Sequence, residues 1–196
     1  MTRILYCVVL SAYATVFVGT YQARTSSSEV HRLFLEDQKD REGPIASLDW
    51  EKISPRDQSR RQRVHEILAA GGLKTAQDFH DAAYIYQHGE DASDFLFAHI
   101  LGMMAVQKGD RSSLWISAAT LDRYLKSVQQ SQVFGTQYNS INNGPYTQDP
   151  YNRILIPDAL RLAFCVPDLE QQQKNIAEFN AGKYPEAGLA PAGCTR

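Results

Sequence analysis

The stretch from Asp94 to Tyr138 concentrates the apolar side chains of this 196-residue chain and constrains its fold most. Apolar residues recur there at three- and four-residue spacing in two segments, which predicts two amphipathic helices. Gly109 and Asp110 separate the segments, and glycine takes the left-handed conformation that ends a helix at little cost. Because two apolar helix faces joined by a tight turn pack against each other, we expect a helical hairpin at the centre of the fold.

The spacing also predicts which residues of this hairpin face the core. In the first helix they are Phe95, Leu96, His99, Ile100, Met103 and Met104. In the second helix they are Leu114, Trp115, Ala118, Leu121, Asp122, Leu125 and Val128. Each predicted face therefore places one ionisable residue, His99 or Asp122, among apolar neighbours.

Capping signals divide the rest of the chain into further helices. The pattern predicts a helix over residues 29–42. Ser54 followed by Pro55 is typical of a helix start, and Thr75 with Asp78 forms the pattern of a capping box for the next helix.

Turn-forming residues dominate residues 132–152 and predict a long loop, with a short hairpin in it. Further helical patterns begin at Pro157 and Leu169. We therefore expect an all-α fold with one helical domain over residues 28–184 and a flexible tail over residues 185–196. An irregular helical bundle and stacked helical hairpins of the tetratricopeptide-like kind both fit this pattern.

Composition suits one globular domain, with 43% hydrophobic and 21% charged residues. The formal net charge of -2 and the pI near 6.2 provide no broad positive field, so we expect no nucleic-acid partner. The one basic run, residues 56–63, is interrupted by Asp57 and fits a solvated helix face better than a phosphate-binding track.

The first 23 residues have the pattern of an export signal. Arg3 precedes an uncharged apolar run that is followed by small and polar residues. The cleavage position stays open between Ala14 and Ala23. Retention as an inner-membrane anchor is an alternative, because residues 4–21 reach the lower limit of about 20 apolar residues for a membrane span. We expect a periplasmic or secreted protein that contacts a membrane only through this segment.

A buried ionisable side chain is costly unless it is paired. We therefore expect either that these helix faces open onto a pocket or that His99 and Asp122 satisfy each other or nearby arginines. The candidate polar cluster comprises Asp37, Arg41, His88, His99, Asp122, Arg123, Gln132, Thr136 and Gln137. Two interpretations are open. The cluster is either a hydrogen-bonded network that sets helix register or a site for acid–base chemistry or anion binding.

We expect no metal and no cofactor. His80 and His88 do not share a helix face, and the sequence contains neither an HExxH motif nor the closely spaced cysteine pair of a metal site. It also lacks the GxSxG turn of a serine nucleophile. Export would allow Cys165 and Cys194 to form a disulfide, while two free thiols with Cys165 buried is the alternative.

Six short strings stand out because of the order in which they follow one another along the chain. They are DQKDR at 37–41, YQHG at 86–89, AH at 98–99, LDRYL at 121–125, QVFGTQY at 132–138 and DALR at 158–161. Together they resemble an uncharacterised family of bacterial helical domains, which carries an early DQxxR element and a later Q-x-[FY]-GTQ element. The resemblance covers about residues 30–167. It implies an all-α fold in a bacterial envelope or secreted setting and no established activity.

The favoured function is therefore a non-enzymatic, exported binding or scaffold module whose partner is a protein or a small polar ligand. The rival is a hydrolase that uses His99 or His88 with Asp122, with the loop over residues 132–152 as a substrate cover.

Overall fold

A computed structural model of the chain describes residues 27, 29–43, 47–142 and 144–183. It is mostly helical, which confirms the predicted all-α fold. After a first helix over residues 29–39, the elements are α2 (Trp50–Ala69), α3 (Ala76–Tyr86), α4 (Ala92–Gln107), α5 (Ser113–Ser127), β1 (Asn139–Ser140), β2 (Tyr146–Thr147), α6 (Asp158–Ala163) and α7 (Leu169–Asn180). The two short strands pair antiparallel within the predicted loop.

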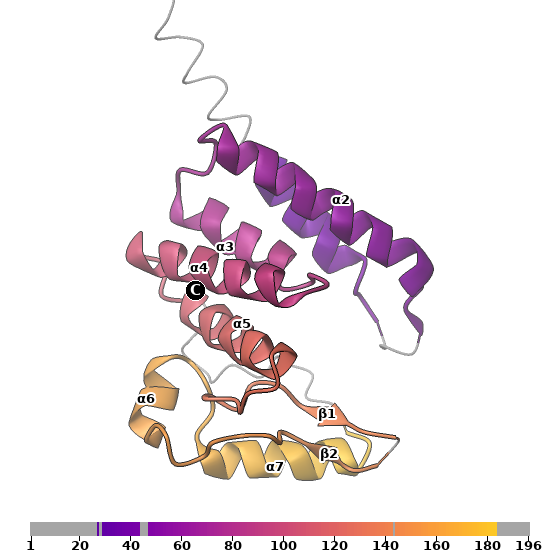
Figure 1. Cartoon of the computed structure of the whole chain (residues 1–196), viewed down its shortest axis with the longest axis vertical. Coiled ribbons are helices and arrows are strands. Elements are labelled where there is room, and N and C mark those ends of the chain that lie inside the picture. Colours follow the sequence, from indigo (N-terminus) through magenta and orange to yellow (C-terminus); the bar gives the residue numbers. More distant parts are fainter. Residues whose placement is uncertain (1–26, 28, 44–46, 143, 184–196) are drawn as a thin grey trace, which may run out of the picture.

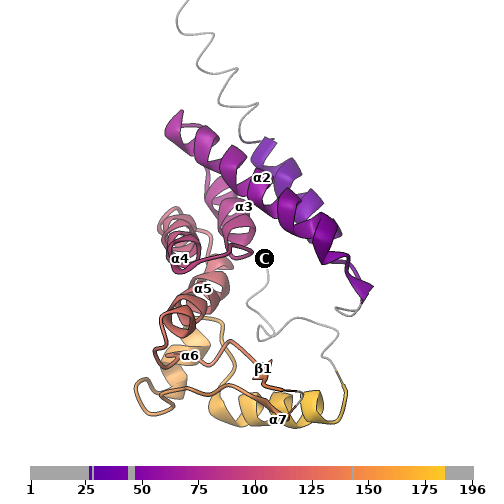
Figure 2. The ribbon, with the colours of Figure 1, turned by 45° about the vertical axis from the view of Figure 1, so that its right-hand side comes forward.

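The elements follow one another along the long axis of the molecule (Figure 1). The first helix and α2 lie at one end, α3 and α4 come next, and α5 separates them from the hairpin, α6 and α7. The turned view keeps this order (Figure 2). Helix α4 packs against both α3 and α5. The predicted central hairpin is thus present.

Helix α2 begins earlier than predicted. Asp49 caps it by accepting a hydrogen bond from the backbone N–H of Lys52, and Pro55 lies inside the helix. Proline lacks an N–H and leaves one carbonyl of the first turn unpaired, which is tolerated here because that turn is exposed. The expected start at Ser54 is therefore wrong.

Other predicted boundaries are confirmed. Thr75 accepts from the backbone N–H of Asp78, while the Asp78 carboxylate accepts from the backbone N–H of Thr75 at 2.7 Å. Gly109 follows α4 with a φ of +102°, the left-handed conformation that a helix end favours.

The predicted inward face of α4 is wrong. Its large apolar residues Leu96, Ile100, Met103 and Met104 are 36–49% exposed. The buried residues are instead Ala98, Leu101, Gly102 and Ala105. A Cβ on Gly102 would lie 2.6 Å from Ser117 Oγ, so the small residues allow α4 to approach α5 closely. Close approach on this side leaves the large side chains on the outside.

Helix α5 contributes to two separate groups of buried apolar side chains. Ile116 belongs to the larger core with α3 and α4, whereas Ala118 packs with Phe134 and Val166 on the other side. Trp115 contacts both groups. Ala118 is buried as predicted, but Val128 at the end of the predicted face is exposed.

In the part of the chain that the structure describes, no helix combines the length and the apolar character needed to cross a membrane. The predicted export signal, residues 1–23, and the predicted tail, residues 185–196, lie outside the described residues.

Candidate functional site

Asp122 anchors the loop that follows α5. One carboxylate oxygen accepts from the backbone N–H groups of Val133 at 2.7 Å and Phe134 at 3.0 Å. The other accepts from the backbone N–H and the hydroxyl of Thr136, both at 2.9 Å. Burial raises the pKa of Asp122, and these donors oppose the rise. The loop occupies both oxygens, so Asp122 has a structural role.

The QVFGTQY string forms a packed turn around its glutamines. Gln132 accepts from the backbone N–H of Gln137 at 2.8 Å and donates to its carbonyl at 3.0 Å. Gly135 has a φ of +78°, and a Cβ there would lie 2.5 Å from Gln172 Oε1 and 2.6 Å from the Tyr151 ring. This part of the loop is held by buried contacts, which does not fit a mobile substrate cover.

The structure separates His99 from Asp122. His99 donates from Nδ1 to the carbonyl oxygen of Ser117 at 2.9 Å. Asp122 follows Ser117 by five positions, which turns its side chain about 140° around the helix. The described hydrogen bonds include none between His99 and Asp122, so the expected pair does not form.

Other members of the predicted cluster do meet. Asp37 is fully buried and accepts from Arg41 Nη1 at 3.0 Å and from His88 Nδ1 at 3.0 Å. Arg41 also donates to Asp57 on α2. Arg60, one turn after Asp57, donates to the same carboxylate at 2.6 Å. The first helix, α2 and the turn after α3 therefore share one network.

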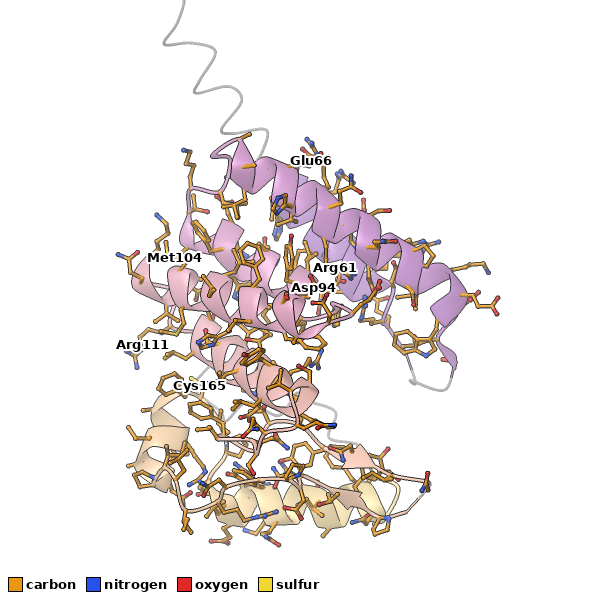
Figure 3. All side chains as sticks on the ribbon, in the orientation of Figure 1. Arg61, Glu66, Asp94, Met104, Arg111 and Cys165 are labelled. Atoms are coloured by element: carbon orange, nitrogen blue, oxygen red, sulfur yellow. The ribbon has the colours of Figure 1, made fainter. Side chains whose placement is uncertain are left out.

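Arg61 joins this network to α4. Its guanidinium donates to the carbonyl oxygen of His88 at 2.9 Å and to Glu90 at 3.0 Å. Its Nε lies 3.2 Å from a carboxylate oxygen of Asp94. Figure 3 shows Arg61 and Asp94 side by side between α2 and α4.

The basic run at residues 56–63 is only partly a solvated face. Arg60 and Arg61 are 5% and 7% exposed, which corrects the expectation for these two positions. The sequence does carry a signal for their burial, because both share a helix face with Val64 and Ile67. That signal identifies inward arginines but not their partners.

Arg123 on α5 differs from these arginines, because none of the described carboxylates pairs with it. It donates to the side-chain oxygen of Gln137 at 3.2 Å and to the carbonyl oxygen of Gln87. Its guanidinium lies 5.8 Å from the centre of the Phe95 ring. Burial and the charge of Arg41 lower the pKa of Arg123, but a guanidinium stays protonated in proteins. The groups that contact its positive charge are thus all neutral.

These side chains line a pocket of about 650 Å³ bounded by α2, the turn after α3, the start of α4, and α5. The charged lining residues are Arg41, Asp57, Arg61, Glu90 and Arg123, and His88, Trp50, Leu48 and Phe95 also contribute to the wall. Arg41 and Arg61 both have carboxylate partners, whereas Arg123 has none among the described residues.

His88 is a neutral member of this wall. Burial lowers the pKa of His88, and the charges of Arg41 and Arg123 lower it further, against the opposing effect of Asp37. The ring donates from Nδ1 to Asp37, which leaves Nε2 as a hydrogen-bond acceptor. None of the described groups bonds to Nε2.

Metal-ligand groups and cysteines complete the description of the site. Within the described residues, no three or more His, Cys, Asp or Glu side chains gather in a group that could hold a metal ion. Cys165 is in a disulfide. Cys194 lies outside the described residues, so the pairing of these two cysteines stays a prediction.

Comparison of the chain with protein-family models, with curated proteins and with solved structures gives no match. The resemblance to a bacterial family of helical domains therefore stays a prediction.

Proposed function

We propose that this protein is a binding module that holds a small organic anion in the pocket beside Arg123. The observation that carries the proposal is the charge of Arg123, which no described carboxylate neutralises and which lines the pocket. A guanidinium presents planar N–H donors that match a carboxylate or phosphate group. A bound anion would supply the missing negative charge.

The size and walls of the pocket support a ligand with an apolar body. A volume of about 650 Å³ is typical of small-molecule sites. Trp50, which is 49% exposed, and Phe95 offer aromatic surface on the wall. We therefore propose an aryl or alkyl carboxylate, or the corresponding phosphate ester, as the ligand class.

Binding is better supported than the rival hydrolase function. His99 is engaged with a backbone carbonyl, and Asp122 is engaged with the loop. Neither residue lines the pocket; His88 does, but it pairs with Asp37 and not with Asp122. We also propose an exported, periplasmic or secreted location, on the strength of the pattern in residues 1–23.

Isothermal titration calorimetry with 3-phenylpropanoate and with phenyl phosphate tests the proposal. We expect at least one of them to bind the wild-type protein, and the neutral 3-phenylpropanamide to bind at least tenfold more weakly. Arg123→Gln should weaken anion binding by about 10- to 100-fold, because a hydrogen bond to a charged group contributes about 1.5–3 kcal/mol.

Arg153→Gln is the matched control, since Arg153 pairs with Asp149 and does not line the pocket. It should leave the affinity unchanged. The proposal fails if neither anion binds, or if Arg123→Gln binds them as tightly as the wild type does.

A further inference from the structure

We infer that the ligand carries a neutral hydrogen-bond donor, such as a hydroxyl group, in addition to its anionic group, and that His88 Nε2 accepts from this donor. The inference deepens the proposed function and rests on it. It assigns the pocket to hydroxy acids or hydroxylated phosphate esters rather than to anions in general.

The surroundings of Asp37 determine where the proton of His88 lies. Asp37 accepts from Arg41 and His88 through Oδ1 and from Gln38 through Oδ2 at 2.8 Å, and Arg60 Nε lies 3.8 Å away. These neighbours are hydrogen-bond donors, as an ionised carboxylate requires. His88 therefore carries its proton on Nδ1, and its Nε2 has a free lone pair.

Apart from Arg123, the charged groups of the pocket wall are already paired with carboxylates or guanidinium groups. Asp57 accepts from Arg41 and Arg60, while Glu90 accepts from Arg61. His88 Nε2, by contrast, has no partner among the described residues, and His88 lines the pocket. The pocket thus combines an uncompensated cation, Arg123, with an unused acceptor.

The charge around His88 decides which donor suits this acceptor. The positive charges of Arg41 and Arg123 both act on the His88 ring. An ammonium group would be repelled by these guanidinium groups, whereas a hydroxyl group carries no charge. A ligand without any donor would bury the Nε2 lone pair unpaired, which is unfavourable.

Calorimetry with matched ligands tests the inference. The probes are 3-phenylpropanoate, 2-hydroxy-3-phenylpropanoate and 3-(4-hydroxyphenyl)propanoate, which differ only in the presence and place of a hydroxyl group. We expect one hydroxylated probe to bind the wild-type protein about 3- to 10-fold more tightly than 3-phenylpropanoate, the gain of one net hydrogen bond.

His88→Asn should remove this preference. The asparagine amide N–H can replace Nδ1–H as the donor to Asp37, but no acceptor remains at the position of Nε2. His65→Asn, at an exposed position of α2, is the matched control and should keep the preference. The ¹⁵N chemical shift of His88 Nε2 in the wild-type protein gives a second readout that needs no variant: it should move with the hydroxylated probe and not with 3-phenylpropanoate.

The outcomes separate the two proposals. Equal affinity for all three probes, with no selective shift of Nε2, overturns the inference and leaves the proposed function standing. Absence of binding by every anion overturns the proposed function, and the inference falls with it. A preference that persists in His88→Asn also overturns the assignment to Nε2.

Discussion

Single residues decide how the loop after α5 is held on the helix. Asp122 accepts from three backbone N–H groups and one hydroxyl group within residues 133–136 of the loop. Gly135 lies inside this arc, where the backbone has a positive φ and two buried side chains leave no room for a methyl group. The most distinctive string of the sequence is therefore explained by packing.

Gly135→Ala should destabilise the protein by about 2–5 kcal/mol, because strain from the positive φ adds to overpacking. Gly71→Ala is the matched control. Gly71 has a similar φ of +68°, but the nearest atom to its added Cβ is the flexible Lys74 Nζ at 3.7 Å. Gly71→Ala should therefore lower the free energy of unfolding only by the strain of the positive φ, about 1–2 kcal/mol. Urea unfolding followed by circular dichroism measures both, and equal losses would contradict the packing argument.

Among the elements, the crossing of α4 and α5 determines which side of α4 faces inward. The close approach at Gly102 and Ser117 depends on a missing side chain, while Ser117 Oγ donates to the carbonyl oxygen of Ser113 at 2.7 Å. Large residues on the opposite side of α4 contribute little to this contact.

Gly102→Val should therefore destabilise the protein by about 1–3 kcal/mol, because the larger side chain forces the two helices apart. Met103→Val introduces the same residue at the next, exposed position and should change the free energy of unfolding by less than about 0.5 kcal/mol. Thermal unfolding of the two variants and the wild type measures the two losses of stability. A larger loss at Met103 would show that the exposed face of α4 is covered in solution.

At the scale of the whole molecule, two polar networks join different sets of elements. The one around Asp122 joins α5 to the loop. The one around Asp37 joins the first helix, α2 and the turn after α3, and it reaches the pocket through His88. The closed network holds the loop on α5. The open one leaves His88 Nε2 without a partner among the described residues, and this is where we propose that a ligand binds.

The lowered pKa of His88 makes the stability of the whole molecule depend on pH. In the unfolded chain His88 has its ordinary pKa of about 6.5, whereas in the folded protein its pKa is lower. Neutral His88 therefore makes its full contribution to the free energy of unfolding above about pH 6.5, and this contribution is lost as the pH falls below that value. Urea midpoints between pH 7.5 and 5.5 should fall more steeply for the wild type than for His88→Asn. Parallel slopes would contradict this assignment.

The sequence by itself determined the features that depend on near neighbours. The capping box at Thr75 and Asp78, the helix end at Gly109 and the all-α class follow from local backbone chemistry, which acts over a few residues. The sequence also placed Asp37, Arg41 and His88 in one candidate cluster, although it added His99 and Asp122, which the structure engages elsewhere.

Only the tertiary structure decided the orientation of α4 and the isolation of Arg123. Helix α4 is apolar on several sides, so periodicity does not select one, and the close approach at Gly102 does. Arg123 has one carboxylate beside it in the sequence, Asp122, which is held by the loop. Which charges remain unpaired depends on contacts between distant segments, and a pattern of neighbouring residues does not contain that information.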